Sequence, residues 1–370
     1  MILMDKKRIL VISSVGTPTP NAIVKPDGSI DYSYSGLEQL CWFLSKELKH
    51  RGRYDVTVVA SFDSLKELYD KEGIEFIPTV PARILNIPER ESWIIAYEKL
   101  KKVAEFDLIH DMSHTGCVYM DMFRAERDGQ FFPPIVKTVH DQQPFGSPPP
   151  VKFPRMCGVS HEHALNLSRS LGIPVIGVPN GVPKELYNFK AEKSERYLTL
   201  GRIQHLKGID TAISIALAAG VPLDVVGDDT HIPNDPYVHR IKRMCDGKQI
   251  RYIGKVTHEQ KAEFLANAKA TILCSNFLDP FNLIVPESNL CGSSVLAFKM
   301  GGLRETTIDG VTGFLGDTSE DLIRRIENGD VNKIKPSDCR QHAINNYTVE
   351  KMVDRYEFLY DKILNDGFGW

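Results

Sequence analysis

The residues best suited to chemistry lie together in the second half of the sequence. Asp279 and Glu287 begin and end the segment D-P-F-N-L-I-V-P-E, which follows an apolar run typical of a strand. The backbone N–H groups of Phe281, Asn282 and Leu283 lie where a loop turns into a helix, so they lack helical acceptors. Carboxylates and amides placed in this way can bind sugar hydroxyl groups or an anion.

A second loop carries two cations. Arg202 and Lys207 lie in G-R-I-Q-H-L-K-G, residues 201–208, between an expected strand and an expected helix. Guanidinium and ammonium groups are the side chains that hold a diphosphate. Taken separately, an acid at a helix start and a pair of solvated cations are ordinary surface features. Taken together, the two segments predict a site for a ligand that combines a diphosphate with a sugar.

One residue of the first half is a further candidate. His140 ends an apolar run typical of a strand. Open α/β sheets bind ligands at the carboxyl ends of their strands, so this histidine is a candidate for ligand contact. A hydrogen-bonded structural histidine is the alternative, and the sequence leaves it open.

Short β-branched runs alternate with longer amphipathic stretches along the whole sequence. The first half is expected to form strands over residues 8–13, 54–60, 75–78, 108–110 and 135–140, with helices over 36–51 and 93–105. The second half is expected to form strands over 197–200, 223–226, 250–253, 270–274 and 294–298, with helices over 209–219, 258–267, 287–291 and 321–327. Such alternation predicts an α/β protein whose parallel sheets are covered by helices on both faces. Residues 310–315 are expected to form a hairpin-like turn.

The length of 370 residues favours two domains, each with its own core. We expect a first domain over 1–182 and a second over 183–345, because residues 183–195 are charged and carry no periodic apolar signal. A terminal segment, 346–370, contains apolar residues at helical spacing from 349 to 363. This last helix packs either on its own domain or on the first.

Composition excludes several classes of protein. Lys and Arg number 45 against 48 Asp and Glu, a net charge of −3, which argues against a nucleic-acid partner. No uncharged apolar run reaches the roughly 18 residues that a transmembrane helix needs, and the start of the chain does not resemble a signal peptide. The seven scattered cysteines contain no C-x-x-C, so we expect reduced thiols and a cytoplasmic protein.

Several catalytic and phosphate-binding motifs are absent from the sequence. It contains no G-x-x-x-x-G-K-[ST], no G-x-G-x-x-G after the first strand, no H-E-x-x-H and no G-x-S-x-G. These absences disfavour a P-loop protein, a typical NAD-binding domain, a zinc protease and an α/β-hydrolase.

An ordered set of motifs resembles a known family. It comprises S-G-L-E at 35–38, F-D-L-I-H at 106–110, T-V-H at 138–140, P-N-G-V at 179–182, G-R…K-G-I-D at 201–210, D-P-F-N-L-I-V-P-E at 279–287 and G-G-L-R-E at 301–305. Each motif alone is weak, but their order along the chain resembles the retaining nucleotide-sugar glycosyltransferases of group 1, the glycogen-synthase-like superfamily. The resemblance implies the GT-B fold, in which two Rossmann-like αβα domains face each other across a cleft and the C-terminal helix crosses back to the first domain.

The resemblance also implies roles for single residues. Arg202 and Lys207 would hold the donor diphosphate, and Glu287 would bind the nucleotide ribose. Asp279 would hold the donor sugar together with the amides of 281–283, and His140 would face that sugar. The remaining two positions implied are Gly16, whose loop would approach the phosphates, and Val256, near the nucleobase. The four charged groups of the second domain are expected to converge on one slot between the domains.

The implied reaction is transfer of a hexosyl group from a nucleotide diphosphate sugar, with retention of anomeric configuration. The acceptor would be a sugar, a sugar phosphate or a lipid-linked glycan, and peripheral contact with a membrane stays open. The sequence has no D-x-D triplet, by which metal-dependent glycosyltransferases hold Mn²⁺ or Mg²⁺. We therefore expect no metal and no cofactor beyond the sugar donor itself.

The sequence departs from the family pattern at four positions. Asp279 replaces the commoner Glu, Asn282 and Ser35 replace Gly, and Pro183 replaces Asp. The first two changes bear on the choice of donor. They also keep open a degenerate protein that binds a nucleotide sugar without turnover. A nucleotide-sugar epimerase or a phosphorylase on the same architecture is a further alternative.

Overall fold

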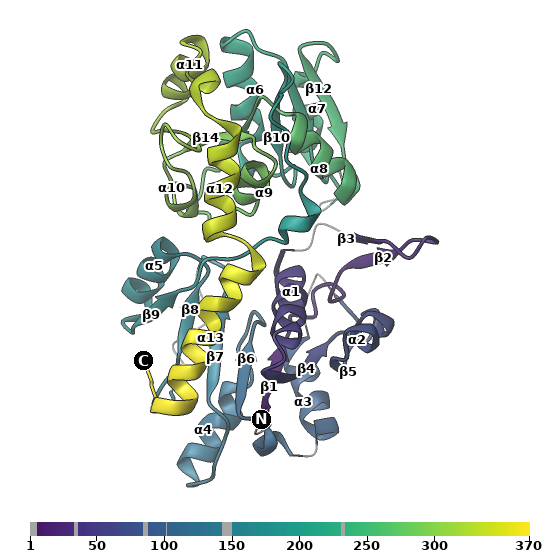
Figure 1. Cartoon of the computed structure of the whole chain (residues 1–370), viewed down its shortest axis with the longest axis vertical. Coiled ribbons are helices and arrows are strands. Elements are labelled where there is room, and N and C mark those ends of the chain that lie inside the picture. Colours follow the sequence, from purple (N-terminus) through teal and green to yellow (C-terminus); the bar gives the residue numbers. More distant parts are fainter. Residues whose placement is uncertain (1–5, 33–35, 84–87, 101, 143–149, 231–233) are drawn as a thin grey trace. The chain divides into compact units, whose positions relative to one another are not determined.

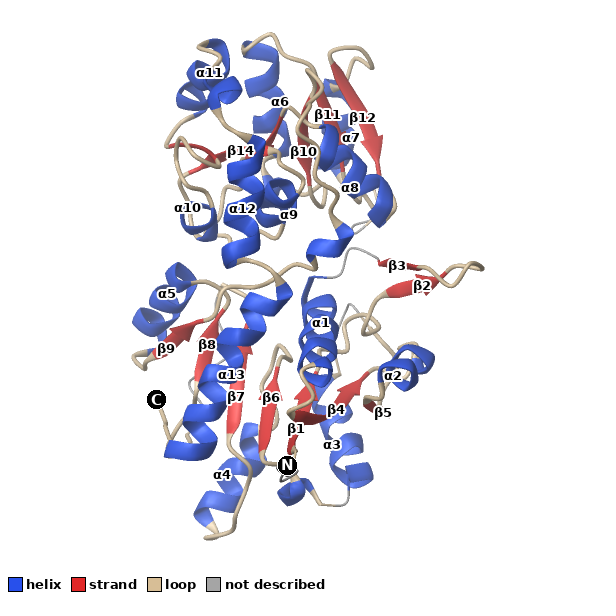
Figure 2. Cartoon of the chain, in the orientation of Figure 1, coloured by secondary structure: helices blue, strands red, loops and turns tan. Residues whose placement is uncertain are grey.

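The computed structural model describes residues 6–32, 36–83, 88–100, 102–142, 150–230 and 234–370, so Ser35 lies outside the described residues. Contacts divide the chain into two compact units. One unit joins Met1–Gly181 to Val349–Trp370, and the other is Val182–Thr348. Figures 1 and 2 show that each unit has its own sheet with helices packed around it.

The first unit is built on a sheet with the strand order β5-β4-β1-β6-β7-β8-β9, in which every neighbouring pair is parallel. Its strands are β1 (Lys7–Ile12), β4 (Tyr54–Ala60), β5 (Glu75–Pro78), β6 (Leu108–Asp111), β7 (Ile135–Val139), β8 (Met156–Gly158) and β9 (Val175–Gly177). Its helices are α1 (Gly36–His50), α2 (Lys66–Glu72), α3 (Glu89–Leu100), α4 (Tyr119–Arg127), α5 (His161–Leu171) and α13 (Val349–Asp366), with a 3₁₀ turn over Val103–Glu105. A separate antiparallel hairpin consists of β2 (Ala22–Val24) and β3 (Ile30–Tyr32).

Helix α13 packs on the first unit, over β7 in Figure 1. Its Tyr356 hydroxyl lies 2.7 Å from the Thr138 hydroxyl of β7, and its Tyr360 hydroxyl lies 2.5 Å from Nδ1 of His110 in β6. Burial lowers the pKa of His110 to about 3, so the imidazole is neutral and can both donate and accept. Arg51, just after α1, also forms an ion pair with Asp354 at 2.8 Å. These contacts tie the end of the chain to the first sheet.

The second unit has a parallel sheet with the order β12-β11-β10-β13-β14-β15. Its strands are β10 (Tyr197–Leu200), β11 (Leu223–Val226), β12 (Ile250–Gly254), β13 (Ala270–Leu273), β14 (Ser294–Phe298) and β15 (Gly313–Gly316). Its helices are α6 (Ile209–Ala218), α7 (Pro236–Met244), α8 (His258–Asn267), α9 (Ile284–Leu290), α10 (Gly302–Thr306), α11 (Ser319–Glu327) and α12 (Pro336–Asn346), with 3₁₀ turns over Lys184–Leu186, His205–Lys207 and Asp330–Lys333. The α/β class with a parallel sheet in each half is therefore confirmed.

Both faces of the second sheet are buried, as its continuous apolar strands predict. Leu223 and Val225 of β11 pack in one cluster with apolar residues of α6, α7 and α11. Val226 of the same strand packs in another cluster, with residues of α8 and α9. Because side chains alternate along a strand, the two clusters lie on opposite faces of the sheet. Helices cover both faces of the sheet, so a ligand can bind at the loops that follow the carboxyl ends of its strands.

Three expectations about the second unit hold only in part. Residues 310–312 form a turn, in which the Gly310 N–H donates to the Gly313 carbonyl oxygen at 2.8 Å, but residues 313–315 belong to the strand Gly313–Gly316, which pairs in parallel with β14. Helix α9 begins at Ile284 rather than at 287, which puts Pro286 in the first helical turn, where proline is tolerated. The segment 183–195 is mostly exposed, as a linker should be, but it also packs on the second unit: Tyr187 is buried, and Lys193 donates to the carbonyl oxygens of Ala266 and Cys291.

The seven cysteines are all free thiols. Among the described residues, no helix combines the length and the apolar character required to cross a membrane.

Candidate functional site

The loops after β10 and β13 bring a lysine and a carboxylate together. The two strands are neighbours in the parallel sheet, so the segments that follow them lie side by side. Lys207 Nζ lies 2.8 Å from Oδ2 of Asp279. The side chains are 20% and 6% exposed, so the ion pair is mostly shielded from water. The same ammonium lies 4.9 Å from the centroid of the Phe277 ring, which adds a cation–π contact.

Two glycines allow this approach of the loops. Gly208 has a φ of +60°, and a Cβ there would lie 1.9 Å from the carbonyl oxygen of Cys274. Gly301 has a φ of +50°, and a Cβ there would lie 2.6 Å from the carbonyl oxygen of Asp279. The next residue, Gly302, donates its N–H to that oxygen at 2.7 Å. The motifs K-G-I-D and G-G-L-R-E therefore hold the loop that carries Asp279 in place.

Asn282 lies beside this ion pair. Its Nδ2 donates to Oδ2 of Asp279 at 3.2 Å, and its Oδ1 accepts from the backbone N–H of Ile284 at 3.1 Å. Phe281 is buried, with its ring against that of Tyr347. The backbone N–H groups of residues 281–283 have no hydrogen-bond acceptor among the described residues. This loop therefore offers a fixed carboxylate and free amides next to a lysine.

Glu287 belongs to a separate buried cluster. Its Oε1 accepts from Lys261 Nζ at 2.8 Å and from the Tyr187 hydroxyl at 2.6 Å. The side chains of Lys261 and Glu287 are 9% and 7% exposed. The Tyr187 hydroxyl also lies 3.1 Å from Nε2 of His258. Glu287 is thus held by two donors inside the second unit.

The sequence analysis missed Tyr187 and Lys261. A signal for Lys261 was available, because it lies four positions before Leu265, which faces the core, on the same side of α8. A lysine on the apolar side of a helix indicates a buried partner. Tyr187 gave a weaker signal, as a single aromatic residue in a charged segment.

Arg202 and Val256 share no hydrogen bond or ion pair with these two clusters in the described part of the chain. Arg202 is exposed, and its guanidinium forms no ion pair with any residue that the structure describes. Its loop is fixed through the backbone, since Ile203 N–H donates to the Asp228 carbonyl at 2.9 Å. Val256 is half-buried between β12 and α8 and packs with Ile253 against the core. Of the four charged groups expected to converge, the contacts in the second unit join Lys207 to Asp279 only.

In the first unit, His140 follows β7. Its Nε2 is buried without a hydrogen-bond partner in the described part of the chain. Burial, together with the nearby charge of Lys137, holds the pKa of His140 well below its usual range, so the imidazole is neutral. The next residue is held from two sides, because Asp141 Oδ2 lies 2.7 Å from His114 Nδ1 and its carbonyl oxygen lies 2.8 Å from His163 Nε2.

Gly16 lies in the loop after β1. Its N–H donates to the Ser14 hydroxyl at 3.2 Å. The next N–H, of Thr17, donates to Oε1 of Glu38 in the first turns of α1, also at 3.2 Å. The conformation of this loop is therefore set by its own unit.

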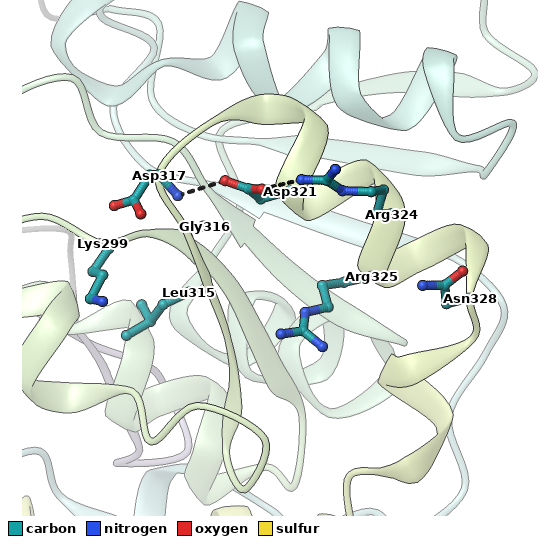
Figure 3. Close-up of a pocket in the computed structure, with 8 residues that line it drawn as sticks. All are labelled: Lys299, Leu315, Gly316, Asp317, Asp321, Arg324, Arg325 and Asn328. Atoms are coloured by element: carbon teal, nitrogen blue, oxygen red, sulfur yellow. Dashed lines mark hydrogen bonds and ion pairs between the residues drawn. The ribbon is translucent and has the colours of Figure 1, made fainter.

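A cavity of about 340 Å³ is lined by none of these residues. Figure 3 shows the residues that line it. It lies at the ends of β14 and β15, and its lining includes Lys299, Asp317, Asp321, Arg324 and Arg325. One of its two acids already has partners: Asp321 caps α11 together with Thr318 and forms an ion pair with Arg324 at 2.5 Å. Arg325 forms an ion pair with Asp330, outside the cavity, at 3.2 Å.

Comparison with solved structures identifies the class of fold. A glycosyltransferase from Rickettsia africae is 18% identical, has a TM-score of 0.76, and is matched over 98% of this chain and 100% of that chain. Sucrose-phosphate synthase from Thermosynechococcus elongatus is 18% identical, with a TM-score of 0.73 and the same coverage. HepE from Anabaena, solved with UDP-glucose, is 18% identical, with a TM-score of 0.66 over 95% and 99% of the two chains. The fold is that of GT-B glycosyltransferases.

Sequence comparison identifies the family. Residues 184–345 match the glycosyl transferases group 1. Glycogen synthase from Mycobacterium tuberculosis is 26% identical over 148 residues, 37% of this chain and 34% of the relative. N-acetyl-alpha-D-glucosaminyl L-malate synthase from Bacillus anthracis is 26% identical over 132 residues, 34% of each. The matched part spans about a third of the length of these curated relatives. The second unit of this chain belongs to the group 1 glycosyl transferases, which confirms the resemblance.

Proposed function

We propose that this protein transfers a hexosyl group from a nucleotide diphosphate sugar to a hydroxyl acceptor, with retention of configuration and without a metal ion. The observation that carries the proposal is the Lys207–Asp279 pair at 2.8 Å, flanked by the free amides of residues 281–283. These groups lie at the carboxyl edge of the second sheet, where ligands of open α/β sheets bind.

The departing diphosphate needs positive charge, because negative charge develops on it as the sugar bond breaks. Lys207 and the exposed Arg202 would supply this charge and take the place of a metal ion. The ammonium of Lys207 would contact both the phosphate and Asp279. A cation anchored in this way is already oriented before the donor binds, which lowers the cost of reorganisation in the transition state.

The sugar and the nucleotide would be held by different parts of the second unit. Asp279 and the amides of 281–283 would accept and donate hydrogen bonds at the sugar hydroxyls. Glu287, fixed by Lys261 and Tyr187, would bind the ribose hydroxyls. From the first unit we propose that neutral His140 donates or accepts at the sugar and that the loop of Gly16 meets the phosphates. Retention rests on the family resemblance, and the leaving phosphate would take the acceptor proton.

The experiment is a panel of UDP-, GDP-, ADP- and TDP-hexoses tested in EDTA. Candidate acceptors are monosaccharides, sugar phosphates and polyprenyl-linked glycans. Nucleoside diphosphate release that requires an acceptor, with the product in the anomeric configuration of the donor by NMR, supports the proposal. Interconversion of the free nucleotide sugars would instead show an epimerase. Binding by calorimetry without turnover on any acceptor would show a degenerate binding protein, which the departures at Asp279 and Asn282 make a real alternative.

A further inference from the structure

Two departures from the family pattern contact each other in the structure. By the resemblance described above, Glu would be expected at the position of Asp279 and Gly at that of Asn282. The Asn282 side chain does not extend freely from the loop, because its Nδ2 lies 3.2 Å from Oδ2 of Asp279. Both residues are 4% exposed. A shortened acid and an added amide therefore occupy the same small volume.

The orientation of the Asn282 amide is set by its two contacts. One end accepts from the N–H of Ile284, the first residue of α9, so that end is the oxygen. The other end faces a carboxylate oxygen, so it must be the donating nitrogen. The amide thus links the start of α9 to the side chain of Asp279.

Two donors fix the carboxylate. Oδ2 of Asp279 accepts from Asn282 at 3.2 Å and from Lys207 at 2.8 Å, while Oδ1 makes neither contact. The χ2 torsion of an aspartate is broad and roughly two-fold, so a single contact would leave the carboxylate free to turn. Two contacts to one oxygen hold the plane of the group and keep Oδ1 in one place. A Gly at 282 would remove one of them.

We infer that Asn282 is a positioning residue: together with Lys207 it fixes the carboxylate of Asp279, so that the pair Asp279–Asn282 sets which donor sugar the protein accepts. The inference rests on the proposed function, since it assigns Oδ1 of Asp279 to a sugar hydroxyl. Asn282 acts through Asp279, and its amide sets where that hydroxyl must lie. The two positions therefore function only as a matched pair.

The first test is a double-mutant cycle of Asn282→Gly and Asp279→Glu, measured as kcat/KM on the best UDP-hexose. Removing a hydrogen bond to a charged group costs on the order of 10-fold or more, so each single variant should fall by about that factor. If Asn282 acts only through Asp279, removing it from the Asp279→Glu variant should cost little more, so the double variant should stay within about three-fold of the less active single variant. Losses in the double variant that equal the product of the two single losses would overturn the inference.

A second variant separates positioning from packing. Asn282→Asp has the same shape but replaces the donor by an acceptor, so it repels Asp279. We expect it to lose discrimination between UDP-glucose and UDP-galactose and to lower kcat/KM more than Asn282→Gly does, while its melting temperature stays close to that of Asn282→Gly. An Asn282→Asp variant with wild-type kcat/KM and sugar preference would show that Asn282 only fills space.

Failure of the proposed function is distinguishable from failure of this inference. If the wild type releases no nucleotide with any acceptor, calorimetry with UDP-glucose and with UDP replaces kinetics. The inference then predicts that Asn282→Asp weakens binding of UDP-glucose by about 10-fold and leaves binding of UDP unchanged. Equal loss for both ligands, or no loss, overturns it. A wild type that binds no nucleotide sugar of the panel overturns both proposals.

Discussion

The buried pair of Lys261 and Glu287 provides a direct test of how the second unit is held together. The substitution Lys261→Met keeps the length of the side chain and removes its charge. The Tyr187 hydroxyl still donates to Oε1 of Glu287, but the carboxylate, 7% exposed, loses its cation. Breaking a buried ion pair by removing one partner costs about 3–5 kcal/mol, because the remaining charge stays out of water.

Two control variants make the magnitude interpretable. Removing both charges in Lys261→Met/Glu287→Leu should recover most of the lost stability, since a buried pair replaced by apolar residues is often neutral. Lys269→Met breaks an ion pair of 3.2 Å whose partner, Glu195, is 83% exposed. Loss of that surface pair should lower the free energy of unfolding by only about 0–1 kcal/mol.

The assay must follow the second unit by itself. All three tryptophans, Trp42, Trp93 and Trp370, lie in the first unit, so intrinsic fluorescence reports on that unit alone. Native-state hydrogen exchange of peptides from α8 and α9 reports the free energy of opening where the pair lies. Lys261→Met should lower it by about 3–5 kcal/mol and leave the fluorescence transition in urea unchanged. A loss in α8 and α9 no larger than that of Lys269→Met would refute the reasoning.

Two further predictions concern a close approach and a pH dependence. Gly208→Ala should prevent the second unit from folding, as measured by circular dichroism and hydrogen exchange. Gly220 has a similar φ of +67° but open space around it, so Gly220→Ala should lower the free energy of unfolding by only about 1–2 kcal/mol. Similar losses of stability in the two variants would contradict the clash at Gly208. For His114, burial lowers the pKa, but the hydrogen bond and charge of Asp141 outweigh it and raise the pKa above the usual value. The stability this adds is complete below the unfolded pKa of about 6.5 and is lost as the pH rises through the higher folded value. Urea titrations followed by tryptophan fluorescence measure the difference in stability between the wild type and Asp141→Asn. This difference should shrink between pH 6 and pH 9. A difference that grows over this range would contradict the raised pKa of His114.

Most strands were predictable because a strand buried on both faces of a sheet appears in the sequence as a continuous apolar run. This applies to β1, β4, β10, β11 and β14, whose bounds differ by at most a residue or so from the expected ranges. Strands β8 and β9 have three residues each, too few to show a periodicity. Strand β15 was taken as part of the turn at 310–312 because its G-F-L-G sequence has glycine at both ends, and its place beside β14 depends on tertiary pairing.

The candidate site was predictable to the extent that local motifs encode it. The pairing of Lys207 with Asp279 joins two loops that follow neighbouring strands, and the glycine motifs beside them mark the close approach. The contact of Asn282 with Asp279 was not predictable, because the sequence shows that both residues are unusual but not that they touch. Tyr187 reaches Glu287 from a charged segment without a periodic apolar pattern, so only the folded chain reveals this contact.

The most direct test of the account is the rate of acceptor-dependent nucleoside diphosphate release by the wild type and by Lys207→Gln, both in EDTA. The glutamine amide can still donate to Asp279, so the substitution removes the charge while keeping the contact. Loss of one group that stabilises the developing charge costs about 10²–10³-fold in kcat. The account predicts a wild-type rate that EDTA does not change and a fall of that size in the variant, measured at a temperature at which hydrogen exchange shows the second unit of the variant to be folded. A variant that keeps the wild-type rate, or a wild type that EDTA inactivates, would contradict it.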